Sequence, residues 1–145
     1  MKKTAFLFMI FTSLVFSADN IIIKNSNYGV SQTIQNIKER AIKKGFGVFT
    51  IINHKGNATI VGEELQEAKL IIFSNPKIDA KMMQENILVG LDLPMKVLVY
   101  RAGESKVELA YKKASSLKNI YNLKNNKLLS QADKMLDEIT NKAIK

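Results

Sequence analysis

The stretch that decides the fold runs from Ala68 to Tyr100. It contains two apolar runs, Lys69-Leu-Ile-Ile-Phe73 and Met95-Lys-Val-Leu-Val-Tyr100, and both have the length and composition of buried strands. Between them lie the turn Ser74-Asn-Pro76 and an amphipathic helical segment that ends in Leu91-Asp-Leu-Pro94. Two strands that flank one helix predict a folding core, and they identify no reaction.

The residues before this stretch predict two strands and a helix. Asn20–Lys24 is a β-branched run. Ser31 is placed to cap a helix that runs to about Lys44, and Gly45 follows as its stop. Phe46–Asn53 carries apolar groups on both faces, which predicts a central strand buried on two sides rather than an edge strand.

The residues after Tyr100 predict a hairpin and a short helix. Ala102–Ser105 is a turn into the strand Lys106–Tyr111, in which every second residue, beginning with Val107, faces inward. Ser115 or Ser116 then opens a short helix that runs through Tyr121. Strands and helices in this order indicate the α+β class.

The tail from Lys127 to Lys145 has a one-sided apolar stripe and is predicted to be a C-terminal amphipathic helix. Such a stripe usually packs on the protein's own sheet or across a dimer, and we favour this interpretation. The alternative is contact with an anionic membrane surface, because lysines flank the stripe. We treat residues 125–145 as a helical extension of the domain at 19–124.

The first residues resemble a signal peptide. Lys2 and Lys3 precede the apolar segment Ala5–Phe16, and small residues allow cleavage after Ser17 or Ala18. We therefore expect residues 1–18 to direct export to the periplasm or outside the cell. A membrane anchor fits less well, because the apolar segment is shorter than a spanning helix needs.

Composition excludes several kinds of site. The chain has no cysteine and one histidine, so disulfides, thiolate or histidine-rich metal sites and cysteine nucleophiles are excluded. The net charge of +9 falls to +7 without residues 1–18, which contain two lysines and no acid. An exported protein seldom meets nucleic acid, so we expect a solvated basic surface, with acidic envelope partners as the alternative.

Several of these segments together resemble the domain of unknown function 302 family. They are Phe73-Ser-Asn-Pro76, the helix with Met82-Met83, Leu91-Asp-Leu-Pro94 with the strand after it, the strand that ends in Tyr111, and Ile52-Asn-His54 upstream. The resemblance covers about residues 34–122. It implies a single antiparallel sheet with helices mainly on one face, often in a homodimer, and it implies no activity.

The sequence departs from the family's pattern at two places. Ser74 stands where the family usually has glycine, and Asp79-Ala80 stands where it usually has Gly-Thr. If these small residues line a ligand pocket in the family, the departures alter or remove that pocket here.

Four residues are candidates for a site, and each has a structural alternative. His54 lies where a strand gives way to the polar segment His54–Asn57, and it is a candidate catalytic or ligand-binding group or a structural hydrogen-bonding one. Ser74 and Asn75 are candidate ligand contacts in the turn, although Asn75 before Pro76 is typical of a helix cap. Asp92 is a fourth candidate, or a local ion-pair partner of Lys96.

No metal or cofactor site is expected. The methionines fit core packing, and the attachment motif of a c-type haem is absent. Our first hypothesis is a non-enzymatic exported module that binds a small ligand or an envelope protein. The alternatives are a small enzyme with His54 as general base and Asn75 or a tyrosine hydroxyl polarising the substrate, and a protein that associates with the envelope through Lys127–Lys145.

Overall fold

The computed structural model describes residues 20–145, so the predicted signal peptide lies outside the described residues. These residues form one five-stranded antiparallel sheet with the order β1-β5-β4-β3-β2. The strands are β1 Ile21–Ser26, β2 Gly47–Asn53, β3 Ala68–Ser74, β4 Met95–Arg101 and β5 Val107–Lys112. The predicted α+β class with a single antiparallel sheet is confirmed.

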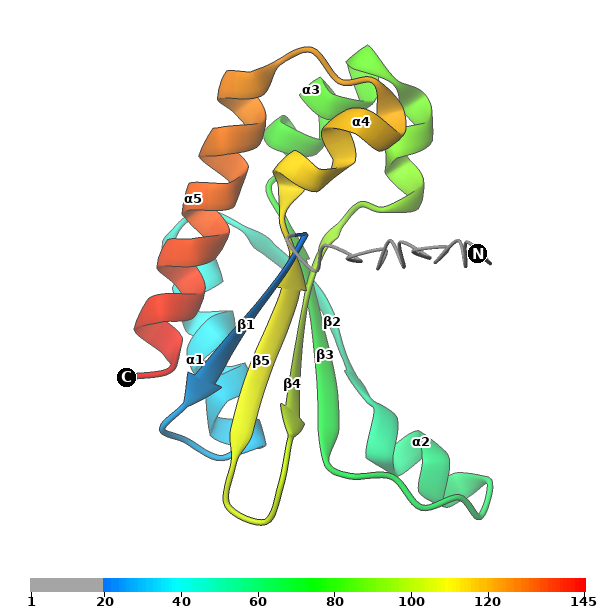
Figure 1. The fold of residues 1–145 in the computed structure, drawn as a ribbon, viewed down its shortest axis with the longest axis vertical. Coiled ribbons are helices and arrows are strands. Elements are labelled where there is room, and N and C mark those ends of the chain that lie inside the picture. The colour runs from blue at the N-terminus through cyan, green and yellow to red at the C-terminus, as the bar shows by residue number, and fades with distance from the viewer. Residues whose placement is uncertain (1–19) are drawn as a thin grey trace, which may run out of the picture.

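Helices cover one face of this sheet and both of its ends. They are α1 Val30–Lys43, α2 His54–Ile60, α3 Pro76–Glu85, α4 Leu117–Tyr121 and α5 Asn126–Ala143, with short 3-10 turns at η1 Ile87–Leu91 and η2 Ala114–Ser116. In Figure 1, α1 and α5 lie against one face, α3 and α4 lie beyond one end, and α2 lies at the opposite end. We call the face without α1 and α5 the open face.

Alternation along the strands sends one set of side chains into the core. Ile71 and Phe73 of β3 and Val97 and Val99 of β4 are fully buried, and they pack under the two helices. Phe73 meets Phe46 edge to face, with ring centroids 5.7 Å apart. The core therefore forms on the helix-covered face, and the alternate residues of the same strands form the open face.

The prediction of a central strand at residues 46–53 was wrong, because β2 is an edge strand. The register with β3 shifts between Val48 and Thr50, so Phe49 is bulged out and 63% exposed. After the bulge, Ile51 joins Val48 on the core side. The bulge reverses the side to which the following residues point. Apolar residues therefore occur at successive positions of β2, although only one face of the strand is buried.

Two helix starts also differ from the sequence prediction. Ser31 is not the cap of α1, which begins at Val30 after Gly29. The Ser31 hydroxyl instead accepts a hydrogen bond from Lys69 Nζ at 2.7 Å. The polar segment at residues 54–57 was not predicted to be helical, but it begins α2, and Asn53 caps this helix by accepting from the Gly56 N–H at 3.1 Å. The predicted stop of α1 at Gly45 is confirmed, with φ of +78°.

The tail is a helix that belongs to the core. Its apolar stripe, including Leu129, Leu136 and Ile139, is buried against the sheet and α1. This is the packing that the sequence favoured, and it uses the apolar side that membrane contact would need. Among residues 20–145, no helix has both the length and the apolar character needed to cross a bilayer.

Candidate functional site

The structure does not bring the four predicted site residues together. His54 follows Asn53, which pairs with Lys69 near the start of β3, whereas Ser74 is the last residue of that strand and Asn75 follows it. A strand of this length separates the two places by about 20 Å. His54 and Asn75 therefore cannot act on one small substrate, which removes that version of the enzyme hypothesis.

His54 has little around it that would support chemistry. It is half-buried and is the first residue of α2. Among the hydrogen bonds of residues 20–145, those at α2 involve Asn53 and Thr59, and none involves the His54 ring. A polar hollow at this end of the sheet is lined by Lys55, Thr59 and residues 62–66, without His54.

Asn75 is a helix cap, as one interpretation of the sequence predicted. Its side-chain oxygen accepts a hydrogen bond from the Lys77 N–H at 3.1 Å, and Pro76 occupies the first helical position of α3. Because the amide oxygen is used in this cap, Asn75 has a structural role at the turn.

The two departures from the family pattern meet in space. Ser74 is buried, and its hydroxyl donates a hydrogen bond to Asp79 Oδ2. The other carboxyl oxygen of Asp79 is buried without a partner within the described chain. Burial raises the pKa of Asp79, and the bond from Ser74 opposes this effect in part. The serine thus contacts the carboxyl group that this chain has at position 79.

Asp92 is surrounded by three polar side chains. It accepts a hydrogen bond from the Tyr121 hydroxyl at 2.7 Å, and its other carboxyl oxygen lies 3.6 Å from Lys112 Nζ. The predicted ion pair with Lys96 was wrong, because Lys96 Nζ donates to the backbone oxygen of Asp92 at 2.9 Å. The hydrogen bond to Asp92 raises the pKa of Tyr121.

Next to Asp92, the sheet opens between β4 and β5. Their pairing ends where Leu98 meets Ala110, although β4 begins at Met95 and β5 continues to Lys112. On their outer sides both segments stay paired, with β3 and β1 respectively. We call the gap between residues 95–97 and 111–112 the fork.

A cavity of about 260 Å³ lies in the fork, and we call it the fork cavity. Its walls are mainly apolar, and its polar lining includes Asp92, Lys96, Lys112 and Lys113. An apolar cavity with a few converging polar groups is the usual form of a small-ligand site. Of the predicted site residues, only Asp92 lines it.

Sequence reasoning missed Lys112, Lys113 and Tyr121 as members of this site. Lys112 and Lys113 directly follow the strand predicted at Lys106–Tyr111, and Tyr121 lies 29 residues after Asp92. The cavity depends on where the pairing of two strands stops. No local pattern in the chain signals that point.

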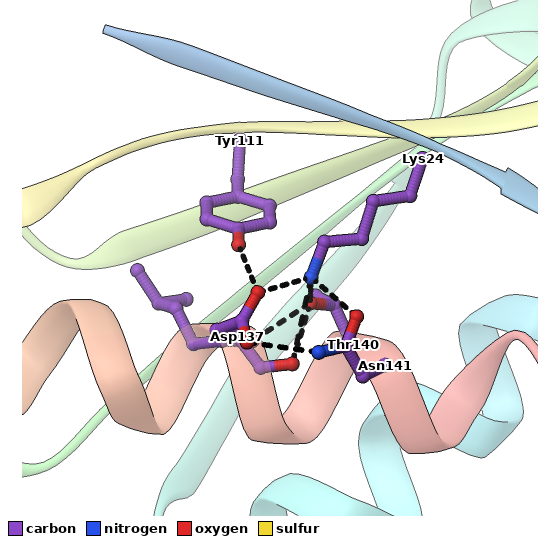
Figure 2. Close-up of polar contacts among 6 residues, drawn as sticks. Lys24, Tyr111, Asp137, Thr140 and Asn141 are labelled. Atoms are coloured by element: carbon purple, nitrogen blue, oxygen red, sulfur yellow. Dashed lines mark hydrogen bonds and ion pairs between the residues drawn. The ribbon is translucent and has the colours of Figure 1, made fainter.

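The densest polar cluster lies elsewhere and joins β1 to α5 (Figure 2). Lys24 Nζ donates to Asp137 Oδ1 at 2.7 Å and to side-chain oxygens of Thr140 and Asn141 at 2.8 Å. The same ammonium lies 5.3 Å from the centre of the Tyr111 ring. The bond from Lys24 lowers the pKa of Asp137. With its donors used, Lys24 holds a strand to a helix, which is a structural role.

Comparison with known proteins agrees with the fold. A family model described as "Domain of unknown function DUF302" matches residues 22–143. The match is wider than the predicted range and includes α5. A solved structure described as an uncharacterized conserved protein DUF302 from Bacillus stearothermophilus aligns with a TM-score of 0.79. It is 22% identical in sequence, and the alignment covers 87% of this chain and 99% of that one, which shows a shared fold.

Longer proteins from Brucella match part of the chain. The "Fluoride-specific ion channel FluC 1" of Brucella suis biovar 1 (strain 1330) is 35% identical over 89 residues, which are 61% of this chain and 35% of that protein. The protein of the same name from Brucella abortus biovar 1 (strain 9-941) is 35% identical over 89 residues, 33% of its length. This chain therefore spans about a third of the curated relatives it matches, and their name describes the whole proteins.

Proposed function

The chain belongs to the DUF302 family, and on that premise we propose that it is a non-enzymatic, exported module that binds a small ligand. The fork cavity carries this proposal. It is mainly apolar, it has polar groups at few points, and it lies where the sheet is open rather than where it is packed. At the opposite end, the His54 side chain has no hydrogen-bonded neighbour among residues 20–145, and it lines neither the fork cavity nor the polar hollow near α2.

An enzyme that uses His54 as a general base has less support. Such a base needs a reacting group within about 3 Å, directly or through one water. The candidate partner Asn75 is at the other end of the sheet, and Tyr121 donates to Asp92 at that same end. A binding role for the fork cavity needs no such partner.

Export is part of the proposal and rests on the amino-terminal pattern of two lysines and an apolar segment. We expect the protein in the periplasmic or secreted fraction, with a mature chain that begins at Ala18 or Asp19. Intact-mass measurement of the protein from that fraction would test this. A mass that includes Met1–Ser17 would contradict it.

A second copy of the chain is the proposed partner of the open face. Ile21, Ile23 and Phe49 are 48%, 57% and 63% exposed, and the two isoleucines alternate with the core-facing Ile22 of β1. The isoleucines lie on β1 and Phe49 on β2, at the two opposite edges of the sheet, and exposed apolar groups that border one sheet face are typical of an interface. We expect a homodimer by light scattering, and Ile23→Lys should convert it to a monomer. A wild-type monomer at all concentrations would contradict this proposal.

The binding proposal is tested by filling the fork cavity. Ala110 lines the cavity, so Ala110→Trp should exclude the ligand, whereas Ala102→Trp makes the same change at an exposed position beyond the other end of the hairpin. Native mass spectrometry of protein purified from envelope extract should show a bound species in wild type and Ala102→Trp, and none in Ala110→Trp. Light scattering on each variant separates a lost dimer from a filled cavity. No bound species in wild type would overturn the proposal.

A further inference from the structure

We propose that the fork cavity takes a small anionic amphiphile, with an unbranched apolar chain in the fork and a carboxylate head at the lysines of its rim. This inference rests on the proposed binding function and goes beyond it by naming the chemical class of the ligand. Three observations carry it: the volume of the cavity, the charges at its rim and the open backbone of the fork.

The volume sets the size of the ligand. An engineered apolar cavity of about 150 Å³ in another protein holds benzene, which has six heavy atoms. By that scale a cavity of about 260 Å³ holds about ten heavy atoms. Leu70, Leu98 and Ala110 line it from the open face, and Met82, Leu117 and Leu136 line it from the packed side. A chain of about eight carbons with a carboxylate matches this size and these walls.

The rim is positively charged. Three lysines and one aspartate, Asp92, line the cavity, and this leaves an excess of two positive charges. The Asp92 carboxylate accepts from the Tyr121 hydroxyl through one oxygen, and its other oxygen lies 3.6 Å from Lys112 Nζ, so it faces one of the three lysines. The Lys112 side chain is 64% exposed, so it has the freedom to turn from Asp92 to a ligand.

The backbone of the fork adds polar groups. Arg101 N–H donates to the backbone oxygen of Glu67, just before β3, and Ala102 N–H donates to that of Lys106, just before β5, each at 2.8 Å. Backbone direction alternates along an antiparallel strand, so Lys96, like Ala102, turns its backbone groups toward β5. Beyond Leu98 and Ala110 the next pair would be Lys96 with Lys112, and this pair is not formed. Their backbone groups therefore face the fork and are placed to bind a polar head.

Four probes separate the contributions of head and tail. Octanoate has both the apolar tail and the carboxylate head. The compounds 1-octanol and octylamine have a tail of the same length, with a neutral head and a positive head respectively. Acetate has the carboxylate head without the tail. By isothermal titration at low salt we expect octanoate to bind at least about tenfold more tightly than 1-octanol, since charge-assisted bonds are the stronger ones. Octylamine and acetate should show no measurable binding.

Variants of the rim test the sign of the charge. Lys96→Gln and Lys112→Gln should each weaken octanoate about tenfold and leave 1-octanol unchanged. Asp92→Asn should strengthen octanoate several-fold, because it removes the only acid of the lining. Lys55→Gln makes the same change as the lysine variants at the opposite end of the sheet and should have no effect. A merely structural role for Asp92 predicts weaker binding of every probe.

The outcomes distinguish this inference from the proposed function. Equal affinity for octanoate and 1-octanol, or a loss of octylamine binding in Asp92→Asn, would overturn the anionic class while the cavity still binds. If no probe binds but native mass spectrometry shows a species that Ala110→Trp excludes, the ligand class is wrong and the binding function stands. If neither experiment shows binding, both proposals fail.

Discussion

The two ends of the sheet differ in what surrounds them. At the end with the fork, the strands β3, β4 and β5 adjoin α3, η1 and α4 (Figure 1). Buried, charged and aromatic side chains line a cavity there. At the end with His54, α2 extends from an edge strand, and Ile60 and Val61 at its tip are 83% and 72% exposed. Both ends carry a candidate site residue, but only the fork end supplies neighbours for one.

This difference shows what makes a polar residue part of a site. His54 has the more versatile side chain, but it lies at a strand end with few neighbours. Asp92 is an ordinary carboxylate, but it stands where the ladder between two central strands stops and a cavity begins. In this chain, the place where strand pairing ends decides which of the two residues lines a cavity.

The largest expected effect compares the packing at the two ends. Leu136 of α5 is buried under the fork cavity, and Leu136→Ala should lower the free energy of unfolding by about 3 kcal/mol, because it enlarges a cavity in the core. Ile60→Ala at the tip of α2 should change it by less than about 0.5 kcal/mol. Urea denaturation followed by circular dichroism measures both. If both variants lowered the free energy of unfolding equally, the side chains at the fork end would be no better packed than those at the tip of α2.

The next effect concerns Asp79 at the fork end. Burial raises its pKa in the folded protein above that in the unfolded chain. The folded state therefore binds the proton of Asp79 more tightly than the unfolded chain does. The stability that this protonation contributes is fully present below the unfolded pKa of Asp79, and it is lost as the pH rises through the folded pKa. Asp79→Asn stays neutral and should gain on the order of 1 kcal/mol over wild type at neutral pH, since a charged oxygen no longer lies buried without a partner.

Urea denaturation at pH 7 and pH 3 tests this expectation. The difference in the free energy of unfolding between wild type and Asp79→Asn should become smaller at pH 3. Glu104→Gln is a similar change at an exposed loop position, and it should have the same free energy of unfolding as wild type at both pH values. A difference that is the same at both pH values would contradict a buried, titrating carboxyl group.

A smaller effect concerns the hydrogen bond between Tyr121 and Asp92. This bond raises the pKa of Tyr121, so its contribution to stability is present below the unfolded pKa of tyrosine and is lost as the pH rises through the folded value. The hydrogen bond to Glu108 also raises the pKa of Tyr100, so ultraviolet titration should show two tyrosines that ionise late. Tyr121→Phe should remove one of the two. Asp92→Asn should return Tyr121 toward the ordinary range. Tyr28→Phe is the control, since that hydroxyl donates to a backbone oxygen.

Local patterns predicted much of the fold but little of the site. The alternation at Val107 and Leu109 and the stop at Gly45 follow from periods and backbone preferences within a few residues, and both are confirmed. The edge position of β2 was missed because a one-residue bulge imitates a strand buried on both faces. The fork was missed because it depends on how far two separate segments stay paired. Asp92 was identified, but its neighbours come from β5 and α4.

The smallest expected effect is at His54, and it tests whether the α2 end of the sheet takes no part in binding. Asn53→Ala should lower the free energy of unfolding by about 1 kcal/mol, because it removes the cap of α2. His54→Ala, one residue later, should change it by less than about 0.5 kcal/mol, since the ring makes no hydrogen bond within residues 20–145. Octanoate affinity should be unchanged in His54→Ala, in contrast to Asp92→Asn. If His54→Ala weakened octanoate binding while Asp92→Asn left it unchanged, the site would lie at the α2 end of the sheet, and the assignment of the two ends would be reversed.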